Sequence, residues 1–525
     1  MSSCKFLIMS ALSALFLASC TGSGIAQSST GSATPVQSQA AGVTVTVYSS
    51  ADPASFDPQQ WIYNESVGND SSGMDPSDVP GFGVVKEVRT ENLNQGQNIL
   101  DFTDVAAFID PTTVSFQDLS FPDTAVLQQQ FKFDLVSPEK LLQKYLGQTI
   151  SVAVPRGNSA VQIVTGTLLS AQDGDLVLQT QNGIQIINGS YNQVQLGALP
   201  EGLMIKPTLE WQVQSSQTGE HKILTAYETK GLTWIADYNM VLGADDKTAS
   251  LAAWVTLLNL SGKTYENARL KLIAGEVNRV QPPRPIMYQM ATAELAGAAP
   301  TFQEKQFFEY HMYTLPRLVT IPQNATQQIA LFPTRSDVNV EKVLVYSGQD
   351  MSPWWSYSDQ PDLSPFSGIT STKQEAGVYI RFMNNKGNSL GIPLPAGKIR
   401  LYQQDPADGS LEFIGEDLLD NTPRDELVSV KVGNSFDVIG ERTQTDFHVD
   451  SVARTATESY SIMLNNHSDA VVHMEVPQYL WRWSNWQITA NSDNFQKLDS
   501  RTIEFSVDVP ANGKKEITYT VVYSW

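Results

Sequence analysis

Short runs of alternating apolar and polar residues, separated by turn-forming residues, recur along most of this 525-residue chain. The stretch from Ile392 to Val438 is typical, because its short runs are broken by Pro, Asp-Gly and Asn residues. A period of two residues belongs to a β-strand with one buried face, whereas an amphipathic helix needs a period of about 3.6. The pattern therefore predicts a mainly β protein, with several antiparallel β-sandwich domains of immunoglobulin-like type.

The N-terminal segment has a different pattern. Lys5 is followed by an apolar run that ends at Ala18, which is too short for a membrane span and predicts an export signal. The run closes in Leu17-Ala18-Ser19-Cys20, which resembles the bacterial lipoprotein box and implies that Cys20 is the lipid attachment point. An ordinary signal peptide cleaved nearby is the alternative. Since Thr21 rather than Asp follows Cys20, we expect a lipid anchor in the bacterial envelope, at the outer membrane.

Charge and cysteine content exclude several classes of partner and cofactor. With 55 acidic against 34 basic residues, the formal net charge of −21 repels phosphate backbones, so we expect no nucleic-acid partner. The two cysteines, Cys4 and Cys20, both lie in the N-terminal segment, so the body of the protein contains no disulfide and no Cys-based metal site. The five histidines form no ligand pair at helical or strand spacing, and we expect neither a metal nor a cofactor.

Composition and turn signals divide the chain into seven predicted segments. These are a lipoprotein signal peptide (1–20), a flexible tether (21–41), an N-terminal β region (42–148), a small SH3-like barrel (149–198), a central β-sandwich (199–335), a second β-sandwich (336–445) and a C-terminal immunoglobulin-like domain (446–525). The barrel is predicted from five short strands with hairpin signals at Asp173-Gly174 and Asn182-Gly183. Ser137-Pro138 opens one short connector helix, and Ala51 to Gly83 is interpreted as a surface loop.

Several longer stretches together resemble a known group of bacterial proteins. The stretches are LTWIADYNMVL, AWVTLLNLSGKTYENARLKLIAGEV, GIPLPAGKIRLYQQD, EFIGEDLLDNTPRDELVSVKVGNSFDV and ITYTVVYSW. They are similar to proteins that carry the domain of unknown function 4139, some of which are labelled mucoidy-inhibitor-A-like. The resemblance extends from about Val43 to the C-terminus, although this chain lacks the long coiled coil of many relatives. It implies a β-rich envelope protein and no settled activity.

No residue pattern specifies a reaction. Gly387-Asn388-Ser389-Leu390-Gly391 matches the G-x-S-x-G motif of a nucleophile elbow, but Ile392-Pro393-Leu394-Pro395 follows where that motif requires a helix. The acidic residues between Asp405 and Glu426 match no calcium-loop spacing, and Asp405 to Gly409 is explained as a turn. We therefore expect no catalytic residue.

Two groups of aromatic residues are candidates for a ligand or partner surface. They are Trp354, Trp355 and Tyr357 in one predicted insertion, and Trp481, Trp483 and Trp486 in YLWRWSNWQ. Exposed indoles stack on sugars or partner proteins, but the same residues also pack in cores and between domains. The favoured prediction is an exported lipoprotein with a structural or protein-interaction role at the cell envelope. A carbohydrate-binding or surface-adhesion protein is the first alternative, and a hydrolase with an unrecognised site is the second.

Overall fold

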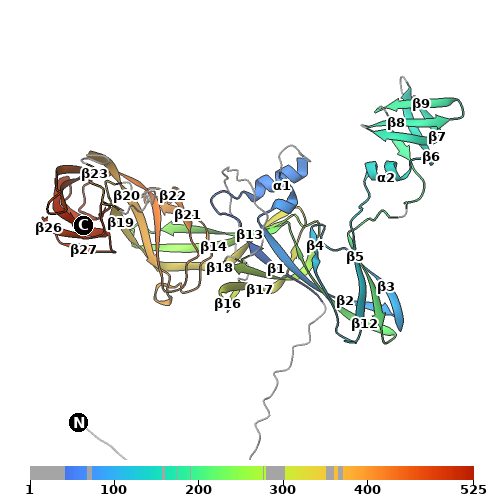
Figure 1. The fold of residues 1–525 in the computed structure, drawn as a ribbon, viewed down its shortest axis with the longest axis horizontal. Helices are drawn as coiled ribbons and strands as arrows, with labels where there is room; N and C mark the ends of the chain where they lie inside the picture. Colours follow the sequence, from blue (N-terminus) through green and yellow to red (C-terminus); the bar gives the residue numbers. More distant parts are fainter. Residues whose placement is uncertain are drawn as a thin grey trace, which may run out of the picture. The chain divides into compact units, whose positions relative to one another are not determined.

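The structure is a computed structural model that describes residues 42–67, 74–156, 160–172, 174–189, 191–200, 202–275, 277–278, 302–349, 360–364 and 371–525. Within these ranges the chain is mainly β, with 29 strands in five sheets and two α-helices (Figure 1). The fold class predicted from the alternating pattern is therefore confirmed.

Three of the sheets share the largest hydrophobic core, which also takes in Ile380, Phe382, Val428 and Val430 from the nine-stranded sheet. The seven-stranded sheet has the order β16 (Gln303–Phe307), β17 (Tyr310–Ile321), β15 (Tyr265–Ala274), β1 (Val43–Ser49), β2 (Gly81–Leu93), β12 (Gly219–Thr229) and β4 (Ile109–Asp118). The three-stranded sheet has the order β3 (Gly96–Thr103), β11 (Thr208–Ser215) and β5 (Ala125–Lys132). The central five-stranded sheet has the order β18 (Ala325–Asn339), β14 (Thr248–Asn259), β13 (Leu232–Leu242), β21 (Gly397–Gln404) and β22 (Leu411–Leu419).

Pairing between strands far apart in the sequence gives these sheets their shape. Most pairs are antiparallel, as predicted, but β1 pairs with β15 in parallel and β13 pairs with β21 in parallel. A parallel pair needs a long connection between its strands, and here each connection contains several other strands. The seven-stranded sheet thus combines strands from both sides of residue 199, where the central β-sandwich was predicted to begin.

The small five-stranded sheet has its own core. Its order is β10 (Gln193–Gln195), β6 (Thr149–Arg156), β7 (Ala160–Gln172), β8 (Asp175–Thr180) and β9 (Gly183–Asn188). The hairpin predicted at Asn182-Gly183 is confirmed, because Thr180 pairs with Gly183. The closed SH3-like barrel is not found among the described residues. The two outer strands, β9 and β10, each pair on one side only, so the sheet is open.

The C-terminal sheet has nine strands around a second large core. Their order is β26 (Trp486–Asn491), β29 (Gly513–Ser524), β24 (Thr455–Asn466), β23 (Leu427–Asp450), β20 (Ser371–Met383), β19 (Glu341–Val345), β25 (Val472–Tyr479), β28 (Thr502–Val509) and β27 (Phe495–Lys497). In β24 every second residue is buried, which is the period of two seen in the sequence.

Two helices are present where the sequence predicted one. The predicted connector is α2 (Pro138–Lys144), and the Ser137 hydroxyl caps it by accepting from the Lys140 backbone N–H at 3.2 Å. The second helix, α1 (Pro58–Val67), lies in the segment interpreted as a loop. Its Trp61 and Ile62 pack against Val79 and Leu258, so tertiary contacts stabilise a helix with little amphipathic pattern. In the described ranges no helix is long and apolar enough to cross a membrane.

A cleft at the ends of the core strands

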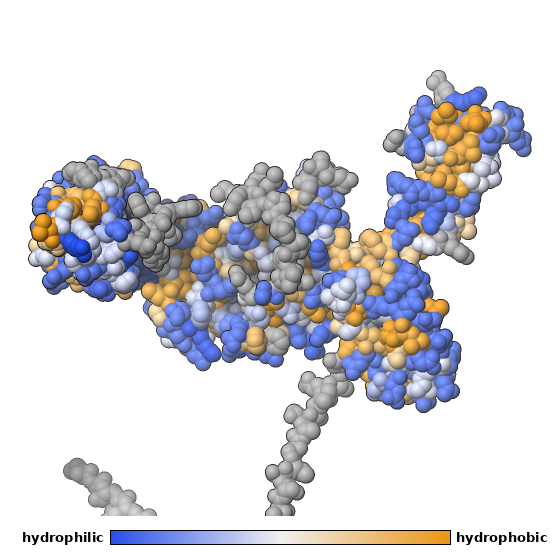
Figure 2. Space-filling view, viewed as in Figure 1, coloured by the Kyte–Doolittle hydropathy of each residue, from blue (hydrophilic) through white to orange (hydrophobic). Residues whose placement is uncertain are grey.

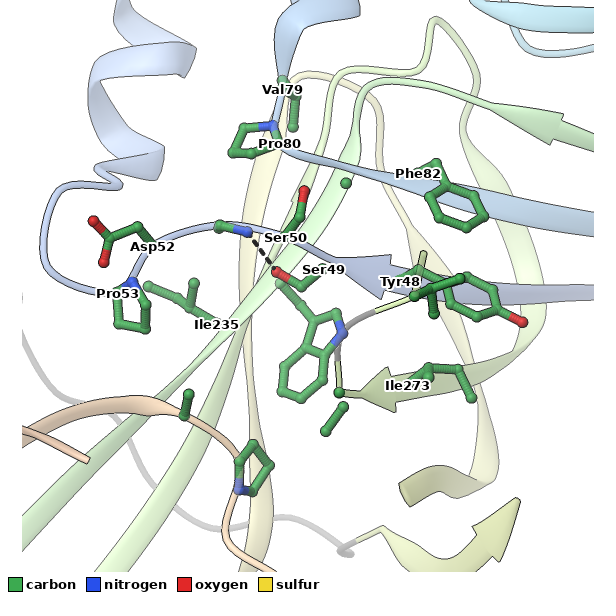
Figure 3. A pocket seen from close by; sticks show the side chains of 18 of the residues that line it. Tyr48, Ser49, Ser50, Asp52, Pro53, Val79, Pro80, Phe82, Ile235 and Ile273 are labelled. Atoms are coloured by element: carbon green, nitrogen blue, oxygen red, sulfur yellow. Dashed lines mark hydrogen bonds between the residues drawn. The ribbon is translucent and has the colours of Figure 1, made fainter. Parts of the chain in front are cut away.

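A cleft lies where strands of the seven-stranded and central five-stranded sheets end (Figure 3). Its volume is about 1110 Å³. It is lined by the end of β1, the start of β2, the end of β15, part of β13, and the segments that precede β21 and follow β22. Residues from six separate stretches of the chain therefore meet in one depression.

Apolar and aromatic side chains form part of the lining of the cleft. The Tyr48 and Phe82 rings are stacked, with centroids 4.6 Å apart and an interplanar angle of 2°. Ile273 lies on the same side as this pair, while Asp52 and Pro53 lie on the other side (Figure 3). The backbone approaches closely here, because a Cβ on Gly81 would lie 2.5 Å from the Tyr48 carbonyl oxygen. Gly81 also has a φ of 133°, so a side chain at this position is excluded on both grounds.

Trp234 provides an unused hydrogen-bond donor in this lining. Its side chain is buried, and its ring contacts Tyr313 edge-on with centroids 6.5 Å apart. The indole Nε1–H is buried and has no hydrogen-bond partner. A buried donor without an acceptor costs about 1–3 kcal/mol, and a rotation of the ring that exposes the N–H to an acceptor in the cleft would recover this free energy.

The rim of the cleft is polar and carries both signs of charge. Lys230, Asp52 and Asp420 all line it, with exposed side chains. Asn421 is fixed by its side-chain oxygen, which accepts from the Ala396 backbone N–H at 2.9 Å. The acidic loop after β22, within the stretch from Ile392 to Val438, therefore forms one wall of the cleft. The lining of the cleft therefore combines apolar and polar groups, and binding sites use such polar groups to orient what they bind.

Tyr48 lines the cleft and has a raised pKa. Burial raises the pKa of its phenol, and the charges of Glu228 and Tyr310 raise that pKa further. Tyr48 therefore stays neutral and can donate a hydrogen bond throughout the physiological range. The cleft as a whole can hold an apolar group and accept or donate hydrogen bonds at its edge.

Of the residues predicted from the sequence, Cys20, Trp354, Trp355 and Tyr357 lie outside the described residues. The other three tryptophans are in the C-terminal sheet region and make contacts within the protein. The Trp481 ring lies 4.5 Å from the Arg482 guanidinium, and Trp483 packs against the second core. Trp486 also packs there, and its Nε1–H donates to the Ser500 carbonyl at 2.8 Å. All three rings are partly buried and make contacts within the protein.

Arg482, in the stretch YLWRWSNWQ, contacts residues of the predicted insertion that contains the other tryptophans. It is buried beside Glu458, with Nε 2.8 Å from the carboxylate. Its Nη1–H donates to the carbonyls of Asp362 and Ser364 at 3.0 and 2.9 Å. Residues 360–364, which belong to the predicted insertion that contains Trp354, Trp355 and Tyr357, are therefore held on the C-terminal core by a buried arginine.

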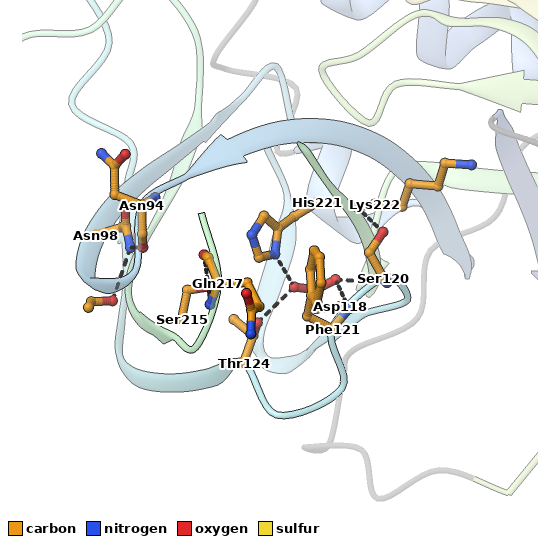
Figure 4. A network of polar contacts seen from close by, with 11 residues as sticks. Asn94, Asn98, Asp118, Ser120, Phe121, Thr124, Ser215, Gln217, His221 and Lys222 are labelled. Carbon is orange, nitrogen blue, oxygen red and sulfur yellow. Dashed lines mark hydrogen bonds and ion pairs between the residues drawn. The ribbon is translucent and has the colours of Figure 1, made fainter. Parts of the chain in front are cut away.

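A buried His–Asp pair lies in a second polar cluster (Figure 4). His221 Nδ1 lies 2.5 Å from Asp118 Oδ2, and both side chains are fully buried. The same carboxylate accepts from the Thr124 hydroxyl at 2.8 Å, while its other oxygen accepts from the backbone N–H groups of Ser120 and Phe121. Asp118 thus fixes the turn after β4 on β12. Full burial gives the pair a structural role.

The remaining histidine, acidic and serine candidates that have been assigned contacts also belong to local structure. His473 Nδ1 lies 2.8 Å from Asp508, and Asp408 accepts from the Ser410 backbone N–H at 2.8 Å, as expected for a turn. That backbone hydrogen bond lowers the pKa of Asp408. Ser389 follows a single 3-10 turn (Lys386–Asn388) in a left-handed conformation, and the chain then leads to β21 rather than to a helix. Among the described residues no group of three or more His, Cys, Asp or Glu could hold a metal ion.

Local sequence patterns did not identify the cleft. Trp234 and Ile235 lie in LTWIADYNMVL, which contributed to the family resemblance, but nothing in that stretch marks them as surface-lining. Comparison with known proteins adds no identification, since no family model matches the chain and no curated protein matches it.

Proposed function

We propose that this protein is an exported lipoprotein with a protein-interaction role at the cell envelope, and that the cleft is where it binds its partner. The lipoprotein-box resemblance at Cys20 supports the anchor. The resemblance to proteins with the domain of unknown function 4139 supports an envelope role and belongs to the same proposal.

The observation that carries this proposal is the composition of the cleft. Its lining offers apolar side chains next to a buried, unpartnered indole N–H, together with one exposed cation and two exposed carboxylates. A protein segment with an apolar side chain next to a backbone carbonyl suits both features, because the side chain covers the apolar part of the lining and the carbonyl accepts from Trp234 once its ring has turned toward the cleft. Formal charge of −21 favours a partner with a basic surface around that segment.

Site-specific photo-cross-linking in intact cells tests the proposal. A photoreactive amino acid at Asn421, on the cleft wall, is compared with one at Val452, which is exposed in the turn between β23 and β24. We expect a discrete cross-linked product from position 421 and none from position 452. Trp234→Phe, which removes only the indole donor, is expected to weaken the product from position 421. Equal products from both positions, or no product from position 421, would contradict the proposal.

The anchor is tested separately by Cys20→Ala. We expect the unchanged protein to fractionate with membranes and the variant to appear in the soluble fraction, because acylation at this position requires the thiol. Ser19→Ala is the matched control, since it keeps the cysteine and a small residue before it. A Cys20→Ala protein that stays with the membrane would refute lipid anchoring at this residue.

A further inference from the structure

We propose that the free edge of β9 in the small sheet binds the same edge of a second copy of this chain. This inference is independent of the cleft and of the role proposed for it. The two strands would join antiparallel across a two-fold axis and extend the small sheet into one continuous sheet of two copies.

The first support is the lack of edge protection on β9. The five sheets have ten edge strands in the described part of the chain. Proteins protect such edges with charges, prolines, bulges or very short strands. Apart from β9 there are nine described edge strands, and seven of them contain a charged residue. These residues are Glu304 in β16, Asp110 in β4, Asp101 in β3, Lys132 in β5, Arg335 in β18, Glu412 in β22 and Lys497 in β27.

The remaining two edge strands are protected in other ways. β10 has only three residues, and the pairing of β26 with β29 is interrupted by a register shift between Ile488 and Ala490. β9 has six uncharged residues, no proline and continuous pairing with β8. It is therefore the one described edge strand with a full-length row of backbone groups and nothing that opposes pairing.

The second support is the exposed face next to this edge. Ile184 and Ile186 point to the same side of β9 and are 63% and 66% exposed. The pairing registers place Val161 and Ile163 of β7 on that same face, and both are exposed. Figure 2 shows apolar residues gathered on the small sheet. The opposite face is already buried against its own core, so only the exposed face is available to a partner.

The geometry of β9 is self-complementary. In an antiparallel pairing centred on Gln185, Ile184 of one copy lies opposite Ile186 of the second copy, and the reverse pair completes the two-fold arrangement. Four isoleucines then lie side by side on one face. Gln185 lies opposite its own equivalent, with Cβ atoms about 4.5–5.5 Å apart.

Charge also favours a second copy at this place. Each chain carries a net charge of −21, so two copies repel each other over most of their surfaces. From Thr149 to Gln195 the charged residues are Arg156, Asp173 and Asp175, which gives one positive and two negative charges and a net charge of −1. The small sheet is therefore a place where two copies meet with little repulsion. A lipid surface would cover the isoleucines but could not pair the backbone edge.

Cysteine cross-linking of the full chain tests this arrangement. Gln185→Cys is expected to form a disulfide-linked dimer in intact cells under mild oxidation, because facing Cα atoms at this spacing suit a disulfide. The control is Gln179→Cys in β8, which is exposed but lies between two paired strands. The unchanged chain controls for Cys4 and Cys20, the two native cysteines.

A second variant separates loss of pairing from loss of folding. Ile184→Lys with Ile186→Lys, added to Gln185→Cys, places charges on exposed positions and is expected to reduce the covalent dimer at least about tenfold. An unchanged circular dichroism spectrum shows that this variant is folded. The proposal would be overturned if the two cysteine variants cross-linked equally, or if the lysine substitutions left the amount of dimer unchanged. A cross-linked product whose mass is not twice that of the chain would also overturn it.

Discussion

Asp118→Asn is the substitution for which the structure supports the most detailed prediction. The carboxylate accepts hydrogen bonds from two backbone N–H groups, the Thr124 hydroxyl and His221 Nδ1. Asparagine can still accept from the two backbone groups through Oδ1, but its NH2 group then faces His221. The imidazole must carry its proton on Nε2 instead, and that atom is buried without a partner.

The expected loss follows from these contacts. The hydrogen bond from His221 to a carboxylate is worth about 1.5–3 kcal/mol, against about 0.5–1.5 kcal/mol for one between neutral groups, so its replacement costs about 1–2 kcal/mol. The two backbone hydrogen bonds to a neutral oxygen are also weaker than those to a carboxylate, which adds about 1 kcal/mol. We therefore expect Asp118→Asn to lower the free energy of unfolding at pH 7 by about 2–3 kcal/mol. Asp123→Asn, in the same turn but exposed, should change it by less than about 0.5 kcal/mol.

The effect depends on pH. Burial by itself raises the pKa of the Asp118 carboxyl, but the hydrogen bonds that it accepts, led by that from His221, outweigh burial and hold its pKa below the usual range. A lowered pKa in the folded state contributes stability that is present above the unfolded pKa of about 3.9 and is lost as the pH falls through the folded pKa. The difference in the free energy of unfolding between the native chain and the Asp118→Asn variant should therefore shrink below about pH 4.

Hydrogen exchange measured by mass spectrometry at pH 7 tests the local effect, because peptides from β4 and β12 report this region separately from the other sheets. Urea unfolding followed by circular dichroism at pH 7 and at about pH 3 tests the pH dependence. A loss below about 0.5 kcal/mol at pH 7, or the same loss at both pH values, would refute the reasoning.

Two further substitutions test the packing of the sheets. Gly397→Ala would place a Cβ 2.2 Å from the Ala236 carbonyl oxygen, so we expect it to cost about 2 kcal/mol or more in thermal unfolding, whereas Gly433→Ala, with open space around it, should be neutral. An equal effect of both would contradict this. Arg482→Met leaves the buried Glu458 without its cation and should cost about 3–5 kcal/mol, and adding Glu458→Gln should restore more than half of that loss in urea unfolding. Simple additivity of the two losses would show that the pair is not coupled.

Local structure was predictable where a short stretch decides it. The Ser137-Pro138 cap and the Asn182-Gly183 turn are set by a few neighbouring residues, and both predictions are confirmed. Asp57-Pro58 carries the same type of start signal for α1, since Asp57 accepts from the Gln59 backbone N–H at 2.9 Å. That signal was outweighed by the Pro, Asn and Gly residues that follow it.

Pairing between distant strands was not predictable from one sequence. Nothing within Val43–Ser49 indicates that β15 will lie beside it, because the alternating pattern specifies a buried face but not a neighbour. The cleft depends on such pairings. Tyr48, Trp234 and Asn421 come together only after distant strands have paired, so no local motif could mark them as a site.

The position of β1 has a mechanical consequence. The described chain begins at Gly42 and enters β1 at Val43, so a force on the N-terminal segment acts first on this strand. β1 lies inside the seven-stranded sheet, paired at five positions with β15 and at seven positions with β2. A pull along the strand loads all of these pairs together in shear, whereas an edge strand would peel away one pair at a time. If the chain is held through Cys20, tension from the membrane is therefore carried by two strand ladders at once.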